Sequence, residues 1–144
     1  MEELTVEALL ASLGYGSAEE YQRVLNNLWE TTSGEYDSFL LELESRKYKD
    51  AMIYLLHRSP AFFDSGKEDV FGKILMKRLR AIYEQIPLDE FGRLAYSVWR
   101  MLPETINSKE PFFTMNYADD CLSYGNEQQC RELYEKMFSY FDKK

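Results

Sequence analysis

The sequence has few of the residues that shape turns, strands or reactive sites. Its 144 residues include seven glycines, four prolines, two cysteines and one histidine. So few turn-forming residues disfavour a fold of many short strands. We find no phosphate-binding Gly-rich loop and no dinucleotide fingerprint, and the spacings of Cys121, Cys130 and His57 fit no zinc pattern. We therefore expect no enzymatic activity, no metal and no cofactor.

Long apolar runs are also missing. The longest uninterrupted one is "AMIYLL", residues 51–56, whereas a membrane-spanning helix needs about twenty apolar residues. The first residues, "MEELTVEALL", are acidic where a secretory signal is basic. We expect a soluble cytoplasmic protein that makes no membrane contact, and in that compartment Cys121 and Cys130 are expected to be reduced thiols rather than a disulfide.

Two groups that could carry chemistry are interpreted otherwise, His57 as a surface or capping residue and the pair Asp119 and Asp120 as solvated. His57 lies near the end of a predicted helix, where a positive side chain is favoured, and Ser59 is not surrounded by a nucleophile motif. Asp119 and Asp120 are adjacent helical positions about 100° apart, so they do not face one another as a catalytic pair. An enzyme with a site assembled from scattered residues stays an alternative, which a shifted pKa in a cleft would favour.

Apolar residues make up 45% of the chain and recur at helical spacing almost throughout. Thr5 is expected to cap the first helix, which stops at Gly14, and Ser17 with Glu20 forms a capping box for the second. We predict an all-α fold, with residues 1–144 forming a single compact domain of seven or eight helices. Later helices are expected at about Tyr36–Leu43, Lys47–His57, Glu68–Ile86, Asp89–Leu102, Pro111–Tyr124 and from the cap Asn126 onward, with loops at residues 61–66 and 106–111.

Two segments resemble one another within the chain. "YQRVLNNLWE" at residues 21–30 and "FGRLAYSVWR" at residues 91–100 share the order of aromatic, arginine, apolar and tryptophan positions. Two amphipathic helices of this length can match by chance. The other interpretation is two related helical halves, as in helical-hairpin solenoids.

Negative charge is concentrated in the first third of the chain. The net charge is −8, which argues against direct nucleic-acid binding because phosphate contacts need a basic surface. Residues 1–45 contain ten acids and one base, Arg23, whereas residues 46–144 contain fifteen acids and sixteen bases. The stretch "ETTSGEYDSFLLELES", residues 30–45, has five carboxylates and no base. Without counterions such a helix loses stability, which favours a binding role.

The helical periodicity of this stretch predicts a face for a partner. With about 100° per residue, Glu35 and Glu42 lie along one flank of the apolar stripe, and Asp37 and Glu44 along the other. Leu41 then points outward between them, as a small apolar anchor inside a charged rim. An ordinary solvated helix with one exposed leucine is the alternative. The predicted partner-binding residues are Glu19, Glu20, Glu30, Glu35, Asp37, Leu41, Glu42 and Glu44.

In size, acidity and lack of catalytic residues, the chain resembles bacterial toxin-immunity proteins, in particular the helical ones of contact-dependent growth inhibition systems. The segment "GSAEEYQRVLNNLWETTSGEYDSFLLELES", residues 16–45, looks like the acidic face of such a protein. Those proteins share no motif that can be matched residue by residue, so no family site is transferred. The resemblance implies an antitoxin that neutralises a basic toxin domain, an RNase, by blocking its substrate cleft. The alternative function is a helical adaptor that docks partner helices or peptides.

Overall fold

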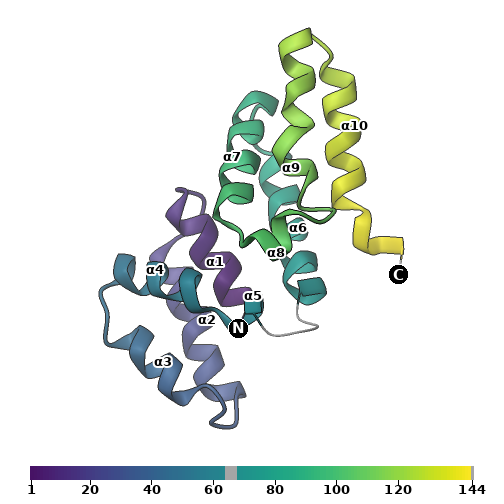
Figure 1. Cartoon of the computed structure of the whole chain (residues 1–144). Coiled ribbons are helices and arrows are strands. Elements are labelled where there is room, and N and C mark those ends of the chain that lie inside the picture. The colour runs from purple at the N-terminus through teal and green to yellow at the C-terminus, as the bar shows by residue number, and fades with distance from the viewer. Residues whose placement is uncertain (64–67, 144) are drawn as a thin grey trace. The chain divides into compact units, whose positions relative to one another are not determined.

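The computed structural model describes residues 1–63 and 68–143, and residue contacts divide the chain into two compact units, residues 1–67 and 68–144 (Figure 1). Every regular element in the described residues is helical, which confirms the predicted all-α fold class. Seven α-helices in this part of the chain have eight residues or more, in agreement with the predicted seven or eight helices. Of the loop expected at residues 61–66, the first three residues instead belong to a short helix, Pro60–Phe63, and residues 64–66 lie outside the described residues.

The first unit encloses one apolar core with helices that run from purple to blue-green in Figure 1. Its central helix buries seven successive residues, 4–10, because it packs against two long helices and a short one. Leu4, Leu25, Leu40 and Leu55 bring four helices together in the core. The helices of this unit are α1 (Glu2–Ser12), α2 (Ala18–Thr31), α3 (Asp37–Glu44), α4 (Tyr48–Arg58) and α5 (Pro60–Phe63).

Local signals set most helix ends in the first unit. The hydroxyl of Ser17 accepts a hydrogen bond from the Glu20 amide at 3.1 Å, as the predicted cap requires. Gly14 follows α1 with a φ of +88°, a left-handed conformation that glycine adopts without strain. The role predicted for Thr5 is wrong, because α1 begins at Glu2 and Thr5 lies inside its first turns.

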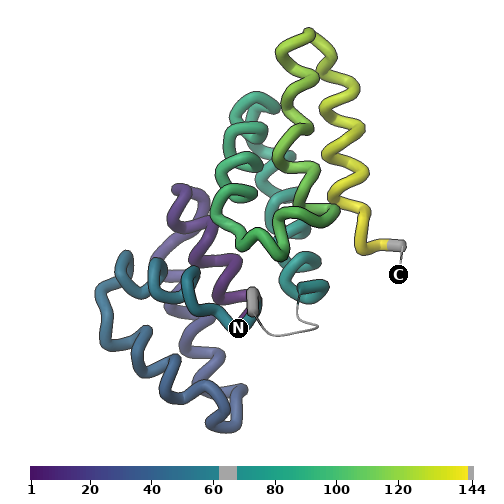
Figure 2. The backbone as a smooth tube through the Cα atoms, in the orientation of Figure 1, coloured from purple at the N-terminus to yellow at the C-terminus, as the bar shows by residue number. Residues whose placement is uncertain are grey.

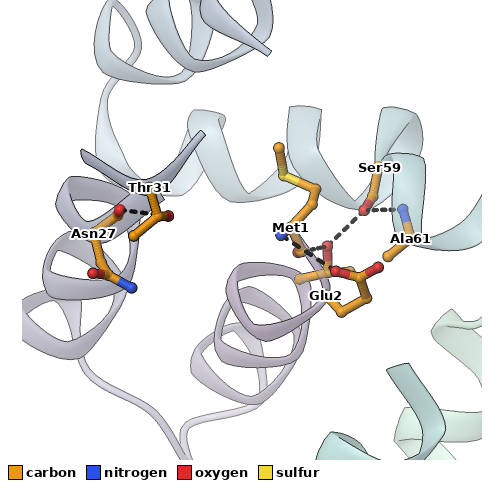
Figure 3. A network of polar contacts seen from close by, with 7 residues as sticks. Met1, Glu2, Asn27, Thr31, Ser59 and Ala61 are labelled. Atoms are coloured by element: carbon orange, nitrogen blue, oxygen red, sulfur yellow. Dashed lines mark hydrogen bonds and ion pairs between the residues drawn. The ribbon is translucent and has the colours of Figure 1, made fainter. Parts of the chain in front are cut away.

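Thr5 instead forms part of a buried hydrogen-bond network between α1 and the α4–α5 junction. Its hydroxyl donates to the carbonyl of Met1 at 2.9 Å, as a threonine within a helix often does. The Ser59 hydroxyl lies 2.6 Å from that of Thr5 and accepts a hydrogen bond from the Ala61 amide at 3.1 Å. Figure 3 shows Ser59 between Ala61 and the start of α1.

The second unit is held together by aromatic side chains. The ring of Phe91 lies 4.9 Å from that of Tyr134 and 5.8 Å from that of Phe138, and Tyr83 packs against all three. Such ring pairs stabilise a core beyond the area they bury. The elements are α6 (Glu68–Tyr83), α7 (Leu88–Met101), α8 (Glu104–Asn107), α9 (Thr114–Tyr117), the 3₁₀ helix η1 (Ala118–Tyr124), α10 (Glu127–Phe138) and the 3₁₀ turn η2 (Tyr140–Lys143).

The end of the chain folds as a helical hairpin. Figure 2 shows η1 and α10 side by side, and the two elements also contact one another along their lengths. Gly125 makes the turn with a φ of +74°, and the side chain of Asn126 caps α10 by accepting from the Gln129 amide at 3.0 Å. The helix end at Gly125 and the helix start at Asn126 were both predicted from these residue types.

Two predictions in the second unit need correction. The helix expected from Pro111 to Tyr124 is divided, since α9 covers four residues and the chain then winds more tightly as η1. Along η1, Asp119 packs so closely on α7 that a Cβ added at Gly92 would lie 2.9 Å from the Asp119 Cβ. The segment 106–111, expected as a loop, begins with the end of α8 and buries Ile106.

The two similar segments lie in different units, residues 21–30 on α2 and residues 91–100 on α7. A common origin of the two halves stays a prediction.

Candidate functional site: the acidic hairpin of α2 and α3

The eight predicted partner-binding residues all lie on α2, on α3 or in the short connection between them. Glu44, the last residue of α3, contacts both Gln22 and Trp29 of α2. The Glu44 carboxylate accepts from the Gln22 side-chain amide at 3.2 Å and from the Trp29 indole at 3.3 Å. Glu44 therefore joins α3 to α2 and is not a free carboxylate.

Leu41 points outward, as the periodicity of the sequence predicts. Its side chain is 64% exposed, whereas the neighbouring Leu40 and Leu43 are buried in the core of the first unit. Asp37 precedes Leu41 by one helical turn and shares its face, because positions four apart on a helix are neighbours. The helix thus presents an apolar side chain beside a carboxylate.

The expectation that the acids of residues 30–45 lack counterions is wrong for Glu42, and outside that stretch Glu20 is also paired. Arg23 Nε lies 3.0 Å from a carboxylate oxygen of Glu20, and Arg23 also lies 3.6 Å from Glu3. Arg46, directly beyond the stretch of residues 30–45, places Nη2 at 2.6 Å from the Glu42 carboxylate, one helical turn away. Exposed pairs of this kind contribute about 1 kcal/mol or less.

Four of the predicted acids remain exposed, and none of them forms an ion pair with another described residue: Glu19, Glu30, Glu35 and Asp37. Glu30 ends α2, Glu35 lies in the connection and Asp37 begins α3, so these three surround one short loop. Glu19 lies in the first turn of α2, about 16 Å along the helix axis from Glu30. We call Glu30, Glu35 and Asp37 with Leu41 the loop cluster.

The acids of the first unit act on neighbouring groups inside it. Burial raises the pKa of Tyr21 to about 12, and the Glu44 carboxylate and Tyr48 act in the same direction. Burial, followed by the carboxylate of Glu7, also raises the pKa of Tyr48. The hydrogen bond to Glu20 raises the pKa of Arg23 further above its ordinary value. Burial and neighbouring carboxylates therefore disfavour ionisation of the two tyrosines, and Glu20 stabilises the cation of Arg23.

The sequence analysis missed a groove on α4 of the same unit. It has a volume of about 430 Å³, and its exposed walls combine aromatic, apolar and basic side chains. Two helical pairs four residues apart, Ile53 with His57 and Tyr54 with Arg58, were the available signal. The sequence interpretation assigns these residues only to an apolar run and to the end of a helix. The α4 groove is lined by Arg46, Asp50, Ile53, Tyr54, His57 and Arg58.

The second unit carries an aromatic groove of about 550 Å³ beside α9 and α10. Tyr140 is 41% exposed on its wall, and the Glu110 carboxylate at its edge accepts a hydrogen bond from the Thr114 hydroxyl. The aromatic groove is lined by Glu110, Pro111, Thr114, Tyr117, Leu133, Lys136, Met137 and Tyr140.

The groups that could take part in catalysis have different surroundings. His57 is exposed in the α4 groove, and Ser59 is fully buried. Burial, together with the charge of Asp120, raises the pKa of Asp119, which packs against α7 and lines neither groove. The absence of enzymatic activity stays a prediction.

Within residues 1–63 and 68–143, no group of three or more potential metal ligands comes together. Both cysteines are free thiols, and burial raises the pKa of Cys130 to about 11. In the same described part of the chain, no helix is long and apolar enough to cross a membrane. Comparison of the chain with models of protein families, with curated proteins and with solved structures gives no match.

Proposed function

We propose that the chain is an immunity protein that binds and neutralises a basic toxin domain, a nuclease, through the loop cluster. The observation that carries this proposal is the exposure of Glu30, Glu35 and Asp37 around one loop, where none of them forms an ion pair with another described residue, beside the exposed Leu41. These carboxylates place three negative charges around one short connection. A cationic partner would neutralise them, which favours its association.

The mechanism is electrostatic steering followed by steric blocking. A nuclease binds phosphates with a basic cleft, and carboxylates presented on a rigid hairpin can occupy that cleft in their place. The hydrogen bonds of Glu44 to α2 and the ion pair of Glu42 hold α3 in position, so little conformational entropy is lost on binding. Leu41 supplies an apolar contact from which water is excluded.

The experiment uses the toxin domain encoded next to this chain, purified as an inactive variant. Reversing Glu30, Glu35 and Asp37 to lysine is expected to lower the association rate at least about tenfold, and the wild-type rate should fall steeply with ionic strength. The matched control reverses three exposed acids of the second unit, Glu104, Glu132 and Asp142, and changes the net charge equally. Equal affinity of the loop-cluster variant and the wild type would contradict the proposal.

The aromatic groove favours the second candidate function, a helical adaptor. Its Tyr117, Met137 and Tyr140 are side chains enriched at protein interfaces, and an apolar peptide would fit among them. Binding through this groove would change little between low and high salt, and would be lost in Tyr140→Ala. Salt dependence therefore separates the two functions, because only the loop cluster acts through charge.

A further inference from the structure

We propose that the aromatic groove beside α9 and α10 is the contact surface of a symmetric dimer, in which a second copy of this chain covers it. The proposal goes beyond toxin binding and does not depend on it, because all the residues that line this groove lie in the second unit. It also gives the groove an occupant other than the peptide of an adaptor.

Both walls of the aromatic groove carry apolar side chains that remain partly exposed. Leu133 and Tyr140 lie two helical turns apart on one wall, and Tyr140 is 41% exposed. On the other wall, the ring of Tyr117 packs against that of Phe113 at 5.6 Å, and Phe113 is 39% exposed, so the apolar surface continues beyond the groove. Aromatic side chains are enriched at protein interfaces, whereas charged side chains are depleted at their centres.

Each wall also carries one charged group without an ion pair. Glu110 and Lys136 are exposed on opposite walls, and neither forms an ion pair with a described residue. The Thr114 hydroxyl donates to one carboxylate oxygen of Glu110. The two acids close to Lys136 on α10 are engaged elsewhere, since Glu132 accepts from a glutamine side chain at 3.1 Å and Glu135 lies 3.7 Å from an arginine of α6. One acid and one base of this groove are therefore available to a partner.

A two-fold axis makes these two charges self-complementary. In a symmetric dimer the same surface of both copies is in contact, so two residues that meet across the axis meet a second time with their roles exchanged. With the axis between Glu110 and Lys136, each carboxylate faces the ammonium group of the other copy, and the dimer contains this ion pair twice. A peptide would need one base and one acid at matching positions, whereas a second copy always carries both.

The distribution of charge along the chain favours self-association through this surface. Residues 1–45 contain ten acids and one base, so two copies repel one another where these residues approach. Residues 46–144 contain fifteen acids and sixteen bases, and the aromatic groove lies among them. Self-association is therefore expected through residues 46–144 rather than through residues 1–45.

The experiment is sedimentation equilibrium of the full chain over a wide range of protein concentration, and we expect the wild type to form a dimer. Glu110→Lys and Lys136→Glu are each expected to weaken the dimer at least about tenfold, because each substitution places like charges in both contacts. A mixture of the two single variants should form a heterodimer as stable as the wild-type dimer, since both contacts then pair a base with an acid.

The matched controls are Lys77→Glu and Glu104→Lys, which make the same charge changes at exposed positions of the second unit outside the aromatic groove. Neither control should change the dissociation constant of the dimer by more than about twofold. Tyr140→Ala should weaken the dimer at low and at high salt, because it removes apolar contact and no charge. Equal thermal midpoints establish that the exposed substitutions leave the fold intact.

Three results would each overturn the proposal. They are a wild-type chain that stays monomeric at millimolar concentration, single charge reversals that dimerise like the wild type, and a mixture of the two single variants that does not associate. The lysine variant of the loop cluster should dimerise at least as tightly as the wild type, because it carries less negative charge. Failure of the toxin-binding proposal and failure of this one are therefore distinguishable.

Discussion

Replacing Ser59 with alanine removes one oxygen atom from the protein interior, and we expect this to lower the free energy of unfolding by about 2 kcal/mol. Ser59 and Thr5 are both fully buried, and their hydroxyl oxygens lie 2.6 Å apart. Thr5 has a single hydroxyl hydrogen, which it donates to the Met1 carbonyl. Ser59 must therefore donate to Thr5 while it accepts from the amide of Ala61.

The magnitude follows from the groups that lose partners. In Ser59→Ala the buried Ala61 amide loses its acceptor, which costs about 1–3 kcal/mol, and α5 loses its cap. Thr5→Val is expected to cost about 1 kcal/mol, since Met1 keeps a hydrogen bond from the Thr5 backbone amide at 3.0 Å. The bond shared by Thr5 and Ser59 is lost only once in the double variant. The sum of the two single losses in unfolding free energy should therefore exceed the loss in the double variant by about 1 kcal/mol.

The assay is urea denaturation followed by far-ultraviolet circular dichroism, with the slope of each transition compared between variants. The control is Ser38→Ala, which removes an exposed hydroxyl on α3 and should change the free energy of unfolding by less than about 0.5 kcal/mol. A Ser59→Ala variant as stable as that control would refute the reasoning. Strictly additive effects of the Thr5 and Ser59 substitutions would show that the two hydroxyls do not share a bond.

Two further predictions concern titratable groups of the second unit. Because burial raises the pKa of Asp119 in the folded state, its contribution to stability is present below the unfolded pKa of about 3.9 and is lost as the pH rises through the folded pKa. Asp119→Asn should lack this loss. The unfolding free energy of the variant minus that of the wild type should therefore rise as the pH increases from the unfolded to the folded pKa of Asp119. A difference that does not change with pH would contradict this prediction. Burial raises the pKa of Cys130 to about 11, whereas Cys121 is half-buried, so maleimide should modify Cys121 first in the native chain. Trypsin leaves both cysteines in one peptide, residues 110–131, so tandem mass spectrometry of that peptide measures the order of modification, and equal rates would show that burial does not protect Cys130.

Local sequence predicted the features that depend on a few neighbouring residues. Ser17 and Asn126 cap α2 and α10 because a short polar side chain reaches the amide three positions on. Gly125 ends η1 because its left-handed conformation suits glycine. The outward direction of Leu41 follows from the helical repeat alone. The ion pair of Glu42 with Arg46 also follows from the helical repeat, because Arg46 lies four positions after Glu42 and one residue beyond the acidic stretch 30–45.

Other predictions failed where a contact from a distant segment overrode the local signal. Thr5 has the side chain of a cap, but Ser59, 54 residues later, takes part in its hydrogen bonding inside the core. The helix expected to continue to Tyr124 tightens into η1, where Asp119 packs against Gly92 of α7. The helix propensity of one residue contributes a few tenths of a kcal/mol to stability, and a buried tertiary contact contributes more than that.

By itself, the amino-acid sequence determined the all-α fold class, most helix ends and the excess of negative charge in the first 45 residues. Only the tertiary structure decided which of those charges are free. Glu44 is engaged because α2 lies against α3, whereas Glu35 in the connection and Asp37 at the start of α3 form no ion pair with another described residue. Composition and periodicity describe one segment at a time, but the partner of a charge depends on which helices meet.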